Sequence, residues 1–233
     1  MRVRWQIVGS CLLGAALMAV LGCGSKAGSP PVAINGNGSA PSTSSSDSGA
    51  ASKPAMPAMP DLHSAHPKVL IDTSMGSVTV ELDAEKAPLA VENFLSYADQ
   101  GFYEQTIFHQ VSKDYILVAG GFDEKMAEKH GRQQIRNEAH NGLKNCRGSI
   151  AMLRLPDAID SARSQFFFNL HDNPLLDYQD DKTPQHYGYC VFGQVVAGQE
   201  VLDLIGQTEV HTFDHFEQIP VRPVVIKAIR RVF

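Results

Sequence analysis

The sequence has no excess of positive charge. Its 233 residues include 20 Lys and Arg against 25 Asp and Glu, which gives a formal net charge of −5. A protein that follows a phosphate backbone usually carries a basic stripe or patch. The composition therefore argues against a nucleic-acid partner.

Cysteine is also scarce. Of the four cysteines, Cys11 and Cys23 lie in an apolar N-terminal segment, which leaves only Cys146 and Cys190 for a folded domain. A disulfide between these two residues and a pair of separate buried thiols are both compatible with the sequence. The sequence alone does not decide between them.

Metal-binding patterns are weak. There is no CxxC spacing, and His211 and His215 lie four residues apart with Asp214 between them. Pro220 and Pro223 follow shortly after, so a polar loop is favoured over a metal-binding helix. We therefore expect no metal site.

The apolar stretch from Ile7 to Leu21 is shorter than the roughly 20 residues of a transmembrane helix. It follows two arginines and ends at a small residue, as export signals do. Val20 to Cys23 resembles a bacterial lipobox, in which the cysteine is lipidated. We expect a signal peptide over residues 1–22 and a mature protein anchored to the periplasmic face of the cell envelope through lipid on Cys23. A plain signal peptide and an uncleaved anchor are the alternatives.

Residues 23–66 are dominated by Gly, Ser, Ala, Pro and Asn. Such a segment has too few apolar side chains to offset the entropy lost on ordering. We interpret it as a flexible tether, and we place the folded domain at residues 67–233.

Apolar periodicity in residues 67–233 indicates a mostly β domain. Residues 69–73 and 78–82 are β-rich runs separated by turn residues. Pro88 begins an apolar repeat at helical spacing that Gly101 can end, and residues 199–206 suggest a second, shorter helix. Further apolar runs lie at 116–119, 149–153, 165–170, 189–196 and 224–229. Many strands with only two helices predict a β-barrel or sandwich with helical caps.

Residues 101–122 read GFYEQTIFHQVSKDYILVAGGF and resemble the signature of the cyclophilin-type peptidyl-prolyl isomerases. The segments 137–148, 164–169 and 188–193 resemble further stretches of the bacterial branch, in the family's order. The resemblance covers about residues 68–233. It implies an all-β-dominated fold, an eight-stranded antiparallel barrel capped by two α-helices.

The resemblance also implies a substrate pocket. Gln165 matches the glutamine that helps to hold the substrate backbone, and Gln110 occupies the place of the catalytic arginine. The substrate-binding candidates are Phe108, Tyr115, Ile116, Leu153, Phe167, Leu175, Leu176 and Tyr189. Barrel core is the alternative for the phenylalanines and is favoured for Phe108, whereas the pocket is favoured for Phe167 and Tyr115.

Two positions differ from the family pattern, and in the family the residues at these positions interact with each other. Besides Gln110, Val118 stands where a second glutamine supports the arginine. A glutamine amide donates hydrogen bonds but has no charge and a shorter reach. Since an ionic hydrogen bond is roughly twice as strong as a neutral one, we expect turnover to fall by about 100-fold or more while peptide binding survives.

The implied chemistry requires little machinery. Rotation about the bond before proline breaks amide resonance across a barrier of about 18–20 kcal/mol. A pocket for the ring, a grip on the preceding carbonyl and a donor to the prolyl nitrogen all favour the twisted amide. We expect no cofactor, proline-containing polypeptides as partners, and a monomer.

Three functions are compatible with these residues. The first is an exported isomerase that assists the folding of envelope proteins, and family membership favours it. The second is a module that binds proline-containing segments without useful turnover, which the changes at Gln110 and Val118 favour. The third is a structural lipoprotein whose pocket is blocked, for which Leu153, in place of a small residue, is the indication.

Leu175 stands where many family members carry tryptophan. From this departure from the family we predict weak inhibition by cyclosporin. Titration of isomerase activity with the drug should give half-inhibition only far above the protein concentration. Complete inhibition at stoichiometric drug would refute this prediction.

Overall fold

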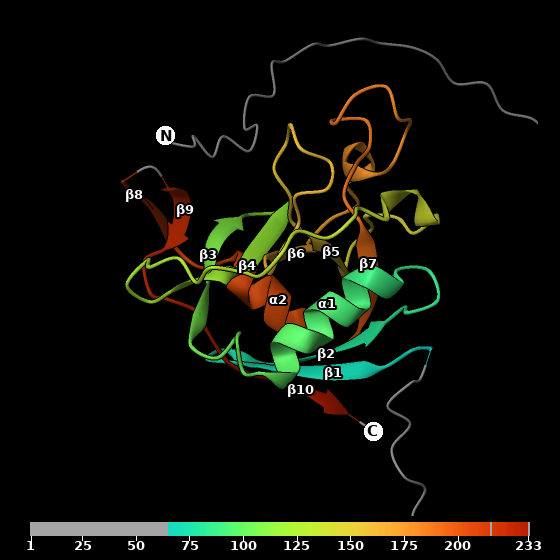
Figure 1. Cartoon of the computed structure of the whole chain (residues 1–233). Coiled ribbons are helices and arrows are strands. Elements are labelled where there is room, and N and C mark those ends of the chain that lie inside the picture. Colours follow the sequence, from blue (N-terminus) through green and yellow to red (C-terminus); the bar gives the residue numbers. More distant parts are fainter. Residues whose placement is uncertain (1–64, 215, 233) are drawn as a thin grey trace, which may run out of the picture. The chain divides into compact units, whose positions relative to one another are not determined.

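The computed structural model describes residues 65–214 and 216–232 (Figure 1). The predicted signal peptide, Cys23 and the predicted tether up to residue 64 lie outside the described residues. The barrel strands are β1 (Lys68–Thr73), β2 (Gly76–Leu82), β3 (Thr106–Ser112), β4 (Ile116–Asp123), β5 (Ser149–Met152), β6 (Phe166–Asn169), β7 (Val191–Ala197) and β10 (Val225–Val232). The other elements are helices α1 (Pro88–Asp99) and α2 (Gln199–Gly206), 3₁₀ turns η1 (Ala139–Asn141) and η2 (Pro174–Leu176), and strands β8 (Val210–Phe213) and β9 (Phe216–Pro220).

The eight strands close into an antiparallel barrel in the order β1-β10-β3-β4-β6-β5-β7-β2. The predicted eight-stranded barrel with two α-helices is thus confirmed. Closure pairs every one of these strands on both sides, so the barrel has no free sheet edge. Strands β8 and β9 form a separate two-stranded sheet.

The first hairpin has the register that its sequence predicts. Val69 lies opposite Val80 and Ile71 opposite Val78, and all four side chains are buried. In the turn, Gly76 has a φ of +136°, and a Cβ atom there would lie 2.9 Å from Val201 of α2. Glycine at position 76 therefore allows the positive φ of the turn, and its missing side chain lets α2 pack closely against the hairpin.

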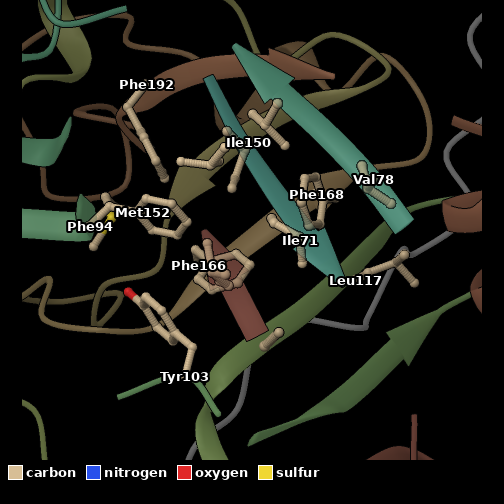
Figure 2. Packing of buried hydrophobic residues seen from close by; sticks show 14 of the residues in the cluster. Ile71, Val78, Phe94, Tyr103, Leu117, Ile150, Met152, Phe166, Phe168 and Phe192 are labelled. Carbon is tan, nitrogen blue, oxygen red and sulfur yellow. The ribbon is translucent and has the colours of Figure 1, made fainter. Parts of the chain in front are cut away.

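Both helices place their apolar stripe in the core inside the barrel, here called the inner core. From α1, the Phe94 ring lies 5.3 Å from the rings of Tyr103, Phe166 and Phe192 (Figure 2). From α2, Leu202 is fully buried in the same core. Strands and helices together thus build the inner core.

The first turn of α1 is capped by a distant side chain. Glu138 is buried, and its carboxylate accepts hydrogen bonds from the backbone N–H groups of Leu89 at 3.2 Å and Ala90 at 3.0 Å. These donors have no partner within the helix, and a negative charge also complements the helix dipole.

We predict that Glu138→Ala lowers the free energy of unfolding by about 1–2 kcal/mol, because it leaves buried helix N–H groups without acceptors. Denaturant titration of the variant checks this. Glu92→Ala, at an exposed position of the same helix, is the matched control and should change stability by no more than about 0.5 kcal/mol. Equal losses for the two variants would show that Glu138 is not a cap.

Two sequence expectations are settled by the described residues. Cys146 is exposed and Cys190 is buried, and both are free thiols. His211 lies on strand β8, so the expectation of a loop there was wrong, while residue 215 lies outside the described part.

Two negative findings concern the same residues. Within 65–214 and 216–232, no three His, Cys, Asp or Glu side chains are arranged to hold a metal ion. In that part of the chain, no helix has the length and apolar character needed to span a membrane.

Candidate functional site

A second apolar cluster, here called the outer cluster, lies on the outer face of the barrel strands, on the other side of the sheet from the inner core. Because side chains alternate along a strand, Phe166 and Phe168 of β6 face the inner core and Phe167 faces outward. The same alternation operates in β4 and β5. The outer cluster consists of Ile116, Val118, Ala151, Leu153, Phe167 and Val191, with Tyr115, Leu143, Leu176 and Tyr189 packed against it.

Strand register aligns part of the outer cluster in one row. Gln110 lies opposite Val118, Val118 opposite Phe167, Phe167 opposite Ala151, and Ala151 opposite Val191. Residues directly opposite each other on neighbouring strands have adjacent side chains. The row therefore begins with one polar amide and continues as apolar surface across five strands.

The structure brings most of the predicted substrate-binding residues together. Six of them belong to the outer cluster or pack against it: Tyr115, Ile116, Leu153, Phe167, Leu176 and Tyr189. Phe108 is 0% exposed and belongs to the inner core, so its inclusion in the pocket is corrected to a core role. Leu175 is 80% exposed on η2, beside Leu176 but outside the cluster.

The cluster has a closed floor and an accessible rim. Phe167 is only 1% exposed and Ile116 only 3%, whereas Tyr115, Leu176 and Tyr189 are half-buried. The Tyr189 ring meets the Phe167 ring edge-on, with the ring centroids 5.6 Å apart. An apolar ring that settles here would contact the rim first and Phe167 last.

Leu153 joins this cluster to a neighbouring cavity. The cavity has a volume of about 170 Å³, and Leu153, Arg154 and Gln165 are among the residues that line it. A peptide that lies over Leu153 can thus reach both the apolar row and this second space.

Arg154 is a buried cation that the sequence did not place. Its guanidinium donates to the carbonyls of Gly188 at 2.8 Å, Leu155 at 2.8 Å and Pro156 at 3.0 Å, and also to that of Pro184. It also lies 4.7 Å from the centroid of the Tyr189 ring. Desolvation lowers the pKa of the Arg154 guanidinium. Because most of its N–H donors are already bonded, Arg154 positions the loop and the Tyr189 ring rather than offering its charge to a ligand.

Gln110 belongs to a short polar chain. Its Nε2 donates to the Ser112 Oγ atom at 3.5 Å, and Ser112 donates to Gln218 Oε1 from β9. Ser112 lies two residues after Gln110 on one strand, a spacing that indicates a shared face. Nothing in the sequence pattern predicted Gln218, because β9 is far away along the chain.

His109 is a buried titratable group beside these residues. Desolvation lowers its pKa to about 4, although hydrogen bonds to the backbone of Ile107 and to the Gln165 side chain oppose the shift. Its ring packs against Phe122 with centroids 4.7 Å apart. His109 is therefore neutral at pH 7, and Gln165 lies next to a neutral imidazole.

This burial predicts a loss of stability in acid. The unfolded chain binds a proton on His109 near pH 6.5, while the folded chain does so only near pH 4. The contribution is complete above pH 6.5 and is lost as the pH falls towards 4, about 3 kcal/mol in all. Denaturant titrations between pH 7 and pH 4 check this against His109→Leu. The variant should lose this part of the pH dependence, and parallel curves for the two proteins would contradict the prediction.

The fold and the outer cluster define a barrel protein with an apolar site on its outer wall. Residues 68–231 match the family of cyclophilin type peptidyl-prolyl cis-trans isomerases. The chain is 42% identical over 162 residues to peptidyl-prolyl cis-trans isomerase A of Dickeya dadantii, covering 70% of this chain and 83% of that protein. It is 39% identical over 161 residues to peptidyl-prolyl cis-trans isomerase B of Escherichia coli, covering 69% and 97%.

Solved structures agree. A cyclophilin type isomerase of Cryptosporidium parvum, crystallised in the presence of the dipeptide Ala-Pro, has a TM-score of 0.60 and 26% identity, covering 70% of this chain and 96% of that one. The chain belongs to the cyclophilin-type peptidyl-prolyl cis-trans isomerase family. It is an enzyme of that class.

Proposed function

We propose that this isomerase acts on Xaa-Pro bonds of exported proteins and assists their folding at the cell envelope, with a turnover limited by Gln110. The observation that carries the proposal is the cross-strand row, in which a neutral amide stands at the end of an apolar strip containing Val118 and Phe167. Export and the lipid anchor on Cys23 rest on the N-terminal sequence, which supports a periplasmic location.

The apolar row binds the prolyl ring. Phe167 forms the floor, and Tyr115, Leu176 and Tyr189 form the rim. Burying the ring here removes apolar surface from water at about 25 cal/mol per Å². Ring burial alone is equal for the planar and the twisted amide, so it sets affinity rather than rate.

Rate requires an interaction that grows as the amide twists. Rotation localises the lone pair on the prolyl nitrogen, which then accepts a hydrogen bond. Gln110 is the polar side chain in register with the apolar row, and its Nε2 amide keeps a second N–H besides the one donated to Ser112. We assign that N–H to the prolyl nitrogen.

The neutral donor limits the rate. Removing an electrostatic donor from a transition state typically costs about 2.7–4 kcal/mol, or 10²–10³ in turnover. Val118 lies directly opposite Gln110, and its side chain has no hydrogen-bonding group with which to orient a longer cationic side chain at position 110. The two positions therefore have to change together to recover full activity.

We predict that Gln110→Arg raises the exchange rate of an Xaa-Pro peptide by about tenfold, and that adding Val118→Gln raises it by about 100-fold. The measurement is two-dimensional exchange NMR with residues 24–233, without Cys23 and its lipid. Val118→Gln alone is the matched control and should give no gain. Gln110→Leu should lower the wild-type rate further.

A wild-type rate that is unchanged in Gln110→Leu would exclude Gln110 as the donor. Line broadening of the peptide without exchange cross-peaks would instead favour the second candidate function, a chaperone or scaffold that binds proline-containing segments. The specific observation in favour of this candidate is the same uncharged pair, Gln110 and Val118.

Leu153→Ala tests whether the site is blocked. Leu153 is 6% exposed within the outer cluster, and the smaller side chain widens the space beside Phe167. If the wild-type chain binds no peptide and the Leu153→Ala variant does, the native cluster is closed and the isomerase proposal fails.

A further inference from the structure

Gln165 lies immediately before β6 at the edge of the outer cluster. Its backbone carbonyl accepts a hydrogen bond from the N–H of Leu153 at 2.9 Å, which fixes the backbone beside the cluster. Its side chain lines the 170 Å³ cavity together with Leu153. The orientation of the Gln165 side-chain amide therefore decides whether a peptide bound between the outer cluster and this cavity meets its N–H donor or its oxygen acceptor.

A glycine lies where the Gln165 side chain crosses β4. A Cβ atom on Gly121 would lie 2.6 Å from Cδ of Gln165 and 2.7 Å from its Cγ and Nε2 atoms. Since non-bonded carbon atoms approach to about 3.5–4.0 Å, a side chain at position 121 and Gln165 in its place exclude each other.

Backbone conformation does not require this glycine. Gly121 is absent from the residues with positive φ, whereas its neighbour Gly120 has a φ of +83°. A side chain at position 121 is therefore compatible with the backbone dihedral angles, and its three nearest obstacles are all atoms of Gln165. The two adjacent glycines serve different purposes.

His109 on the neighbouring strand β3 holds the amide from another side. Its side chain is hydrogen-bonded to the backbone of Ile107 and to the side chain of Gln165. The contact with Ile107 fixes the plane of the ring, and the contact with Gln165 holds the amide against it.

The imidazole is in turn fixed by aromatic packing. The His109 ring meets the ring of Phe122 at 4.7 Å, and Phe122 meets Phe216 of β9 at 4.9 Å. Phe122 directly follows Gly121, so one stretch of β4 supplies both the space for Gln165 and the support for its hydrogen-bond partner.

We propose that Gly121 and His109 are positioning residues that orient the Gln165 amide so that its Nε2 donates to a backbone carbonyl of the bound peptide. The peptide is one whose proline occupies the outer cluster, so the inference rests on the proposed function. Neither residue touches the substrate. Both act through Gln165.

A double-mutant cycle on the full-length chain tests this proposal, with kcat and KM measured on an Xaa-Pro peptide. Gly121→Ala should lower kcat/KM by about 10- to 100-fold, because a displacement of about 1 Å is enough for such a loss. Its thermal midpoint should stay close to that of the wild type, because the new methyl group displaces a flexible side chain. Gln165→Ala should give a similar loss.

The matched control is Gly121→Ala in the Gln165→Ala background. With Cγ, Cδ and Nε2 removed, the methyl group at position 121 meets none of these atoms, so no further loss is expected. Independent losses that multiply in the double variant would overturn the proposal. So would wild-type kcat/KM in Gly121→Ala.

The orientation itself is measured by the side-chain amide resonances of Gln165. His109→Phe keeps a ring against Phe122 but removes the hydrogen bond to Gln165, so the Gln165 amide signals should shift and kcat/KM should fall. His109→Asn restores a hydrogen-bonding side chain and should recover part of the loss, which a purely structural role would not explain. Unshifted amide signals in His109→Phe would overturn the assignment.

The same double-mutant cycle can be measured with peptide dissociation constants in place of kcat/KM. This measurement distinguishes a failure of the Gln165 positioning from a failure of the proposed isomerase mechanism. If the wild-type chain binds the peptide without turning it over, the isomerase mechanism through Gln110 fails. A coupled loss of affinity for Gly121→Ala and Gln165→Ala then still supports the positioning of Gln165, and additive losses overturn it.

Discussion

The alternation of side chains across β4, β6 and β5 is the constraint on which the rest of the structure depends. One set of residues, including Phe166 and Phe168, fills the inner core, and the intervening residue Phe167 forms the outer cluster. A shift of register by one residue would exchange the two sets and expose the core. The strand register that stabilises the inner core therefore also sets the positions of the outer-cluster side chains, because the two sets alternate along the same strands.

Electrostatics distinguish this site from an ion-based one. The buried cation Arg154 is bonded to backbone carbonyls and stacked on Tyr189, while the position in register with the apolar row carries the neutral Gln110. His109 is neutral as well, because its burial lowers its pKa to about 4. The side chains of Gln110, Ser112, Gln165 and His109 are thus uncharged, and their hydrogen bonds depend on placement more than on charge. That dependence explains why a glycine such as Gly121 has a role in positioning.

Sequence patterns predicted the strands and helices that have one apolar and one polar face. The hairpin with Val78 and Val80 and the helix that begins at Pro88 each showed one apolar face, and both lie where the patterns indicated. Strand β3 gave no such pattern, because nearly all its side chains are buried. Strand β8 gave none because all four of its residues are exposed. The family resemblance, rather than periodicity, was needed for the closed order of the barrel.

The site residues also fall into two groups, those that the sequence identified and those whose role appears only in the folded structure. Those in the signature segments, such as Tyr115 and Ile116, could be named from the resemblance, and the structure brings them together. The contacts of Arg154 and Gln218 depend on backbone carbonyls and on a hairpin distant in the sequence. No local spacing encodes such contacts. Likewise, the reason for Gly121 becomes visible only once the Gln165 side chain lies across it.

The first and last strands of the barrel are neighbours, with Lys68 opposite Val232. Strand β1 is bonded along its length to β10 on one flank and to β2 on the other. A force directed along β1 is therefore shared by hydrogen bonds on both of its flanks, whereas an edge strand has such bonds on one flank only.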